Sequence, residues 1–298
     1  MESIMINFLK YRTIALSFSI FVILGTAGLY FYKRAVYGHA FRFSVDFTGG
    51  TSVRLQFDKA VGSEQIESIL SKHGWEQVST REFADTNEVE VRVPEVEVDA
   101  QGLGARIAQV LQDELPDNKV TVVATESVGP GVGKALRTNS IYAIIFALLA
   151  MLAYISIRFW SIGFAAGSVF ALLHDAVVIL GLFMILDLEI SNEVIAAILA
   201  TLGYSINDTI VIFSQIRDSL RTMKDRSIYD IVNISLNKTF RRTILTSIST
   251  ALTVGAMFVF GGPVLRGFSL AFLIGIIFGT FSSIYVASPI MLLFQGEE

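Results

Sequence analysis

The sequence contains no cysteine and only three histidines among its 298 residues. The absence of cysteine excludes disulfides, thiolate nucleophiles and thiolate metal sites. So few histidines also argue against a histidine-rich metal centre. We therefore expect no metal site. We also expect that the protein uses no cofactor and is not an enzyme.

Charge is also scarce and unevenly placed. Charged residues make up 17% of the chain and hydrophobic ones 53%, whereas soluble domains have about 25% and about 45 to 50%. Of the 50 charged residues, 28 lie between Lys33 and Arg137. The net charge is -4 and no long basic tract is present, which argues against a nucleic-acid partner. These patterns indicate that one segment faces water and the rest faces lipid.

Several apolar stretches are long enough to cross a bilayer. A transmembrane helix needs about 20 mainly apolar residues to cross roughly 30 Å of hydrocarbon. The six stretches of this kind are Ile14–Tyr32, Ile141–Ile157, Ser161–Leu186, Asn192–Ile216, Ile244–Val264 and Phe268–Phe294. The sequence therefore predicts an α-helical polytopic membrane protein with six transmembrane helices.

The basic residues of the short connections predict the orientation. Lys and Arg are enriched in short cytoplasmic loops. With a cytoplasmic N-terminus, ten basic residues lie on the cytoplasmic side: Lys10, Arg12, Arg158, Arg217, Arg221, Lys224, Arg226, Lys238, Arg241 and Arg242. The opposite short connections contain only Arg266. We expect a multi-pass protein of the cell (inner) membrane with both termini in the cytoplasm.

The segment between the first two spans has the pattern of a water-soluble α/β domain. Its strand-like and helix-like runs follow the order β-α-β-β-α-β, which is typical of a ferredoxin-like sandwich. The predicted strands and helices, in chain order, are Thr51–Phe57, helix Ser63–His73, Gln77–Phe83, Glu88–Val93, helix Asp99–Asp113 and Lys119–Thr125. Ser63 is the expected N-cap of the first helix, and 85–87 the expected turn. Gly129–Gly133 reads as a hinge or linker back to the membrane.

These patterns divide the chain into three parts. Residues 1–32 contain the N-terminus and the first transmembrane helix. Residues 33–138 form the external (periplasmic) domain, and 139–298 form transmembrane helices two to six with a cytoplasmic loop over 217–243.

Asp208 is the clearest candidate for proton handling. It follows Asn207 in the fourth span, nine residues before Arg217, so it lies roughly 13 Å above that charged loop. Ionisable residues at membrane depth are costly and often mark ion or proton pathways. The alternative, equally open from position alone, is a structural hydrogen bond to a neighbouring helix, as Ser205 and Thr209 can also make.

His174 and Asp175, near the middle of the third span, form a second polar position. Successive helical residues point about 100° apart, so we expect that the two do not pair with each other and that each finds a partner on another span. A proton relay and a structural hydrogen-bonded cluster both fit this pattern. Together with Asp208, Asp175 also fits an aspartyl intramembrane protease, but no protease motif accompanies them.

Two further pairs of residues suggest a role, one pair basic and one pair glycine. Arg241 and Arg242 fit interface anchors, and either one, continuing helically into the membrane, is able to approach a carboxylate. Gly275 and Gly279 have the small-xxx-small spacing in the last span and predict a close approach between helices.

Several motifs together resemble one family. Their segments are Val45–Gly50, His174-Asp175, Gly203–Val211, Asn233–Ser247, Gly261–Pro263 and Gly279–Ile284. In order and spacing they resemble the SecF family of the bacterial SecD-SecF protein-export complex, which is related to the resistance-nodulation-division transporters. Each segment is weak alone, but together they span nearly the whole chain.

The resemblance implies an accessory subunit of the Sec preprotein translocase that uses the proton gradient with SecD to drive late steps of protein export. The implied partners are SecD, the SecYEG channel, YajC, the translocating unfolded polypeptide and membrane lipid. Asp208 would be the proton-handling carboxylate and Arg242 its basic partner. We add Asn207, His174 and Asp175 as further candidates for proton handling or coupling.

The Asp-Phe-x-Gly-Gly piece would lie at the base of the external domain. There Gly49 and Gly50 allow a tight turn before the first strand. We assign Asp46 a structural or coupling role, since an Asp in such a turn often hydrogen-bonds to the local backbone.

Two other functions remain open. One is a subunit of a resistance-nodulation-division exporter of small molecules or lipids, although six spans and one external domain of about 100 residues are few for a self-sufficient exporter. The other is a scaffold for a channel that moves no ions. The scaffold hypothesis and the hypothesis of proton-driven export differ in whether Asp208 titrates.

Overall fold

The computed structural model describes residues 5–75, 78–83, 86–94 and 100–295. The chain divides into two compact units. We call Met1–Arg42 with Ile141–Glu298 the membrane unit, and Phe43–Ser140 the sheet unit. The two units are described separately.

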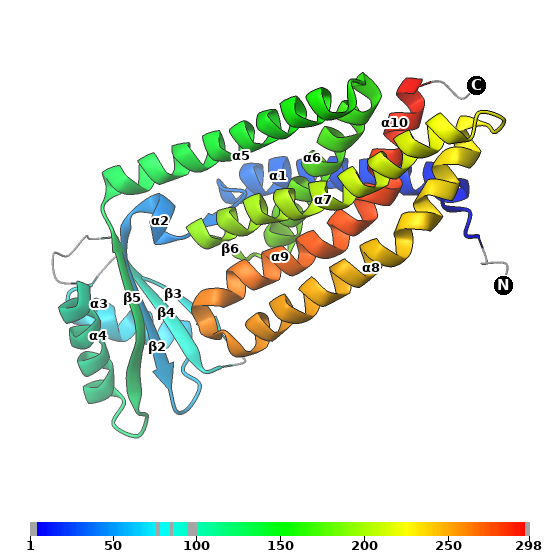
Figure 1. Cartoon of the computed structure of the whole chain (residues 1–298). Helices are drawn as coiled ribbons and strands as arrows, with labels where there is room; N and C mark the ends of the chain where they lie inside the picture. Colours follow the sequence, from blue (N-terminus) through cyan, green and yellow to red (C-terminus); the bar gives the residue numbers. More distant parts are fainter. Residues whose placement is uncertain (1–4, 76–77, 84–85, 95–99, 296–298) are drawn as a thin grey trace. The chain divides into compact units, whose positions relative to one another are not determined.

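The membrane unit is mainly helical (Figure 1). Its elements are η1 (Phe8–Tyr11), α1 (Arg12–Tyr37), most of α5 (Pro130–Phe159), α6 (Ile162–Ile185), β6 (Glu189–Ile190), α7 (Asn192–Thr222), α8 (Ile228–Phe260), α9 (Gly262–Ser282), the π-helical turn η2 (Ser283–Ala287) and α10 (Ser288–Gln295). Six helical segments are long and apolar enough to cross a membrane, the last being α9, η2 and α10 in succession. The prediction of six transmembrane helices is confirmed.

The six spans are not equally buried. In α6, α7 and the last span, half or more of the apolar window is buried by other parts of the chain. In α1, α5 and α8 most of the window stays exposed. The interior of the bundle therefore lies where α6, α7 and the last span meet, with α1 packed against α6 and α8 packed against α7 and α9.

Two helices run past the predicted membrane boundaries. The predicted cytoplasmic loop 217–243 is mostly helical, because α7 continues to Thr222 and α8 begins at Ile228. The Ser227 hydroxyl accepts a 3.1 Å hydrogen bond from the Asp230 amide, which caps the start of α8. The helix of the predicted fifth span, Ile244–Val264, ends four residues earlier: Phe260 ends α8, and Gly262, with φ +73°, starts the next helix.

The sheet unit is an antiparallel sheet with two helices on one face (Figure 1). Its elements are β2 (Gly50–Phe57), α3 (Ser63–Lys72), β3 (Ser79–Phe83), β4 (Glu88–Val93), α4 (Ala100–Glu114) and β5 (Val120–Val128). The strand order is β3-β4-β2-β5, with every neighbour antiparallel. This order and the β-α-β-β-α-β sequence confirm the ferredoxin-like fold.

Alternating residues of the strands fill one core. In β2, Val53, Leu55 and Phe57 lie in this core, against Ile66 of α3 and Leu103 of α4. The residues between them point to the opposite face, because successive side chains alternate across a strand. The helices therefore cover one face of the sheet, and the polar residues of β2 and β4 occupy the other.

The connections of the sheet unit differ from the prediction at two places. Ser63 is not an N-cap: Gly62 takes that position, and the Ser63 amide donates to the Glu82 carboxylate of β3. These hydrogen bonds lower the pKa of Glu82 against a smaller opposing effect of burial. The predicted linker Gly129–Gly133 is helical from its second residue, since Pro130 begins α5 with its φ already suited to a first helical position. The predicted Gln77, Asp85 and Asp99 lie outside the described residues.

Candidate functional site

Asp175 of α6 forms the centre of a buried polar cluster. The hydroxyls of Ser205 and Ser282 both donate to its Oδ2, at 2.6 and 2.9 Å. Ser205 belongs to α7 and Ser282 ends α9, so one carboxylate oxygen joins three transmembrane segments. Asp175 has no exposed surface. A carboxylate at this depth is stabilised by hydroxyl donors from neighbouring helices, because buried polar groups are normally hydrogen-bonded.

His174 pairs with its neighbour, contrary to the prediction. Its Nδ1 lies 3.2 Å from Oδ1 of Asp175. Both side chains are buried among other helices, so they share one polar space although their Cα–Cβ bonds diverge. The expected partners on other spans are present for Asp175, whereas Nε2 of His174 is buried with no hydrogen-bond partner among the described residues.

Asp208 lies one turn after Ser205 on α7. Its side chain is 3% exposed, and its Oδ2 has no hydrogen-bond partner within the described part of the chain. Two polar residues of α8 act on Asp208: Ser247 and Arg242, the second through its charge. Between these two described side chains, Asp208 and Arg242, no ion pair within 4 Å is formed.

Hydroxyl groups continue the polar interior around both carboxylates. Thr209 and Ser283 share a 2.9 Å hydrogen bond, and the Ser283 hydroxyl also donates to the Ser205 carbonyl at 3.3 Å. Ser247 and Thr280 share another at 2.7 Å. The π-helical turn η2 begins at Ser283, so consecutive Ser282 and Ser283 both face the interior. π-helical turns within α-helices frequently occur at functional sites.

The remaining intramembrane candidates lie on the surface of the bundle. Asn207 of α7 is exposed, so it does not join the cluster around Asp175. Arg242 of α8 is exposed as well, although its charge acts on Asp208. The sequence-derived candidates therefore separate into a buried group, His174, Asp175 and Asp208, and an exposed pair.

Gly275 and Gly279 explain how closely the last span approaches α7. A Cβ on Gly275 would overlap the Thr201 side chain, and one on Gly279 would lie 3.1 Å from Cβ of Ser205 and 3.5 Å from Oδ2 of Asp175. The absence of side chains at these positions lets Ser282 reach the carboxylate.

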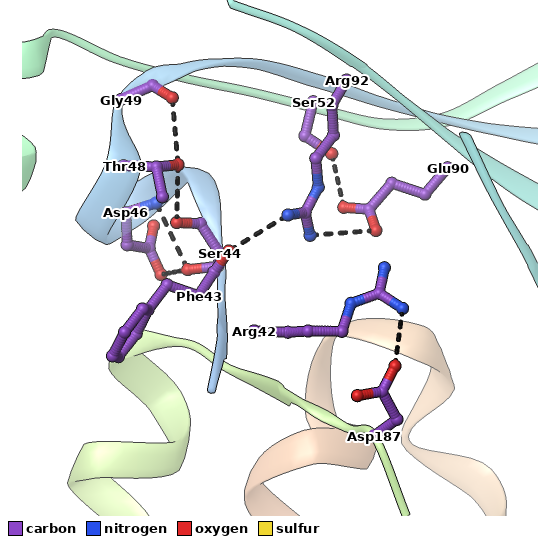
Figure 2. A network of polar contacts seen from close by, with 10 residues as sticks. All are labelled: Arg42, Phe43, Ser44, Asp46, Thr48, Gly49, Ser52, Glu90, Arg92 and Asp187. Atoms are coloured by element: carbon purple, nitrogen blue, oxygen red, sulfur yellow. Dashed lines mark hydrogen bonds and ion pairs between the residues drawn. The ribbon is translucent and has the colours of Figure 1, made fainter. Parts of the chain in front are cut away.

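The Asp-Phe-x-Gly-Gly piece forms a short helix and a tight turn in the sheet unit. Helix α2 (Val45–Thr48) is capped by Ser44, whose hydroxyl accepts from the Asp46 amide at 3.2 Å and donates to Oδ2 of Asp46 at 2.9 Å (Figure 2). Gly49 and Gly50 have φ of +78° and +108°. A Cβ on Gly50 would lie 2.7 Å from the Val93 carbonyl.

One ion-pair group is absent from the sequence-derived candidates. Asp187, after α6, forms an ion pair with Lys33 of α1 at 3.0 Å. It forms a second ion pair with Arg42 of β1 (Arg42–Phe43) at 3.1 Å (Figure 2). Partial burial raises the pKa of Asp187, but the hydrogen bonds and charges of Lys33 and Arg42 outweigh it and hold the pKa below its usual value. The available signal was an acidic residue directly after the third span, Asp187, together with the basic residues at the end of the first span, Lys33 and Arg34.

A second polar group lies on the sheet face opposite the helices. Ser52 donates to Glu90 at 2.6 Å, and Arg92 donates to Glu90 at 3.3 Å and to the Phe43 carbonyl at 3.0 Å (Figure 2). Burial raises the pKa of Glu90, yet the charges of Arg92 and Arg54 and the Ser52 hydrogen bond bring it below its ordinary value.

The chain matches known proteins along most of its length. A family model described as "Protein export membrane protein SecD/SecF, C-terminal" matches residues 108–297, and one described as "SecD/SecF GG Motif" matches 37–61. A protein translocase subunit SecF from Pseudomonas aeruginosa is 35% identical over 288 residues, covering 96% of this chain and 90% of that protein. The one from Haemophilus influenzae is 40% identical, covering 84% of this chain and 76% of the relative.

A solved structure agrees with these matches. The crystal structure of SecDF, a translocon-associated membrane protein from Thermus thermophilus, has a TM-score of 0.85 and 32% identity, covering 97% of this chain and 38% of that one. The sequence of a Thermus thermophilus SecDF subunit is also 37% identical over 270 residues, covering 88% of this chain and 36% of the longer protein. On these grounds the chain belongs to the SecF family, the multi-pass membrane subunits that serve the Sec protein translocase in protein export.

Proposed function

We propose that this chain couples proton movement through the membrane to protein export, with Asp208 as the group that binds and releases the proton. Arg242 is its basic partner, because it acts on the Asp208 charge without forming an ion pair within 4 Å. A cation at this range favours the charged carboxylate without fixing it permanently. Such a carboxylate is able to change its protonation state during a cycle.

The observation that carries this proposal is the contrast between the two buried aspartates. Asp175 has hydrogen-bond donors at both oxygens, which suits a structural role in joining helices. Asp208 is almost as deeply buried, yet its Oδ2 has no partner in the described parts of the chain. An incompletely satisfied carboxylate at membrane depth is unfavourable for stability, and such groups commonly serve proton or ion pathways.

We propose SecD as the partner that covers the exposed side of this site. Asn207 is an exposed amide in the middle of a span, and a Cβ added at Gly203, one turn earlier, would meet nothing within 4 Å. An amide facing hydrocarbon lacks hydrogen-bond partners, whereas an adjoining helix supplies them and packs closely against glycine. The longer Thermus thermophilus SecDF relative supports this choice, because this chain corresponds to only part of it.

The remaining assignments follow from the family and the charge pattern. We propose that the complex acts beside the SecYEG channel, with YajC, on an unfolded polypeptide in transit. We place it in the cell (inner) membrane with both termini in the cytoplasm and the sheet unit outside, as the ten-to-one distribution of basic residues favours. The sheet unit would then lie where the exported chain emerges.

The central experiment compares Asp208→Asn with the parent chain in vesicles that contain the chain, SecD and the channel. Asn has nearly the same volume but does not ionise, so assembly should persist while gradient-dependent export and proton flux are lost. Asp218→Asn is the matched control, since Asp218 lies on the same helix and makes only an exposed 3.8 Å contact with Arg217. Full gradient-dependent export in Asp208→Asn vesicles would support a scaffold instead.

Orientation has its own test, which the absence of cysteine makes simple. Lys72→Cys in α3 and Lys224→Cys between α7 and α8 place single thiols at exposed positions. A membrane-impermeant maleimide added outside intact cells should label the first and not the second. The opposite pattern, or equal labelling, would contradict the proposed topology.

A further inference from the structure

Two ion pairs join the turn after α6 to the segment from α1 to Arg42. They are formed by Asp187 with Lys33 and Arg42. Lys33 donates to Asp187 Oδ1 at 3.0 Å and to the Met184 carbonyl at 2.8 Å. Met184 lies in the last turn of α6, where carbonyls lack partners within the helix, so Lys33 satisfies a helix end as well as a carboxylate. Arg42 donates to the other oxygen, Oδ2, at 3.1 Å. We call these three residues the Asp187 clasp.

The backbone of the turn is shaped for this contact. Asp187 has φ +50°, a left-handed conformation that is uncommon for residues with a side chain. The Leu188 amide donates to the Phe183 carbonyl at 2.8 Å and closes the turn behind it. The Asp187 side chain is still 53% exposed, so the clasp is accessible to solvent and ions.

Arg42 is the last residue of the membrane unit before the chain enters the sheet unit. The next residue, Phe43, is held within the sheet unit, because its carbonyl accepts a 3.0 Å hydrogen bond from Arg92, which is itself paired with Glu90 (Figure 2). Two consecutive residues are therefore each fixed by a charged group of their own unit. A flexible linker would leave both free to rotate.

We propose that Asp187 is a positioning residue that fixes Arg42 to the membrane unit, so that movement of the helices passes through the Arg42–Phe43 peptide into the sheet unit. This inference rests on the proposed proton-driven function. It identifies the peptide through which movement of the helices reaches the sheet unit. Energetic coupling between distant sites needs packed or hydrogen-bonded elements that move together. The clasp supplies such an element, and it holds α1 and α6 to the same carboxylate.

The first measurement is the mobility of the segment beside the clasp. His39→Cys introduces a single exposed thiol between α1 and Arg42 for a spin label, in a chain that otherwise has no cysteine. Asp187→Asn in the full chain assembled with SecD should raise the mobile fraction of the label by about two- to fivefold, the range expected for loss of a partly exposed ion pair. Asp187→Glu keeps the charge but fits the positive φ less well, so its label mobility should lie between those of the parent and Asp187→Asn. Asp218→Asn, which breaks an exposed pair elsewhere, should change nothing.

The second measurement separates positioning from proton handling. In vesicles with the channel, Asp187→Asn should reduce gradient-dependent export while proton flux through the complex persists. Asp208→Asn should abolish flux without changing label mobility. An unchanged label in Asp187→Asn, or a mobile label with full export, would overturn the positioning role. Full export in Asp208→Asn would contradict the proton function alone, because the label measurement does not depend on it.

A further variant guards against a general loss of structure. If Asp187→Asn does not accumulate in the membrane, Arg42→Gln leaves the Lys33–Asp187 pair and the α6 cap in place while it releases the connecting residue. It should reproduce both the higher mobility and the loss of export. Parent-like behaviour of an Arg42→Gln complex on both measurements would refute the proposal.

Discussion

The Ser205 hydroxyl donates a 2.6 Å hydrogen bond to Oδ2 of Asp175, although the two residues lie 30 positions apart on different transmembrane helices. Ser282 of the last span donates to the same oxygen. The three most buried spans, α6, α7 and the last span, are thus joined by hydrogen bonds to Oδ2 of Asp175. Ser205 lies within one helical turn of Asp208.

Removing either serine hydroxyl should loosen this junction. Ser205→Ala and Ser282→Ala should each lower the free energy of unfolding by about 1 kcal/mol, as is usual for hydrogen bonds between helices in membranes. Thr253→Ala is the control, because Thr253 is exposed and bonds only to the Ser249 carbonyl of its own helix. Denaturant unfolding in detergent measures the difference. Equal stability of all three variants would mean that the junction adds nothing to packing.

Glycine should be required at Gly275 in the last span and dispensable at Gly255 in α8. Gly275→Ala places a methyl group against Thr201 and should destabilise the bundle by roughly 1 to 3 kcal/mol through overpacking. Gly255→Ala meets nothing within 4 Å and should leave stability the same or slightly higher, since alanine favours helix. Thermal aggregation of the two variants, compared in one detergent, decides the point. A Gly275→Ala chain as stable as Gly255→Ala would contradict the close approach.

Arg242 should act through its charge more than its shape. It forms no close ion pair with Asp208, so Arg242→Lys should retain most gradient-dependent export whereas Arg242→Ala should lose it. Lys238→Ala is a control on the same helix, one turn earlier. Export assays in vesicles at matched protein levels give the comparison. Equal loss in the Lys and Ala variants would instead indicate that the guanidinium geometry is needed.

The sheet unit should fold without the membrane unit and should weaken in acid. Its core is contained in the strands and two helices, so a fragment from residues 40 to 128 should melt cooperatively. The pKa of Glu90 is lower in the folded state than the unfolded value of about 4.3, so its stabilising contribution is complete above that pH. The contribution disappears as the pH falls through the lowered value.

Melting curves between pH 7 and pH 3 should therefore show a loss of stability at the acid end that Glu90→Gln reduces. Asp58→Asn, at an exposed position, provides the matched change of one charge. A coil-like circular dichroism signal from the fragment would show that the domain needs the membrane unit. Identical acid slopes in the parent and Glu90→Gln would exclude Glu90 as the titrating group.

The sequence predicted the elements that depend on local pattern. Apolar length sufficed for six spans, and alternation sufficed for the strands, because both signals lie within a few turns or residues of the chain. The Ser63 cap was wrong because the acceptor at that helix start, Glu82, comes from a strand 19 residues later. The helical continuation past Arg217 was missed because charge marks where water begins and does not mark where a helix ends.

In the candidate site, too, local sequence patterns predicted some features, whereas others depend on residues far apart in the chain. Asp175 and Asp208 stand out in any apolar span, so their importance was visible without coordinates. Which of them is fully hydrogen-bonded depends on Ser205 and Ser282, and serine is too common in transmembrane helices to be singled out by type. The Asp187 clasp depends on residues about 150 positions apart, Lys33 and Asp187, that no local pattern connects.

The π-helical turn over Ser283–Ala287 fixes how many residues the last span must contain at this point. A deletion of one residue there would restore a regular α-helix and rotate everything after it by about 100°. Met291 and Leu292, which have almost no exposed surface, would then turn out of the core. Relatives of this chain should accordingly vary in residue type across this turn far more freely than in the number of residues it contains.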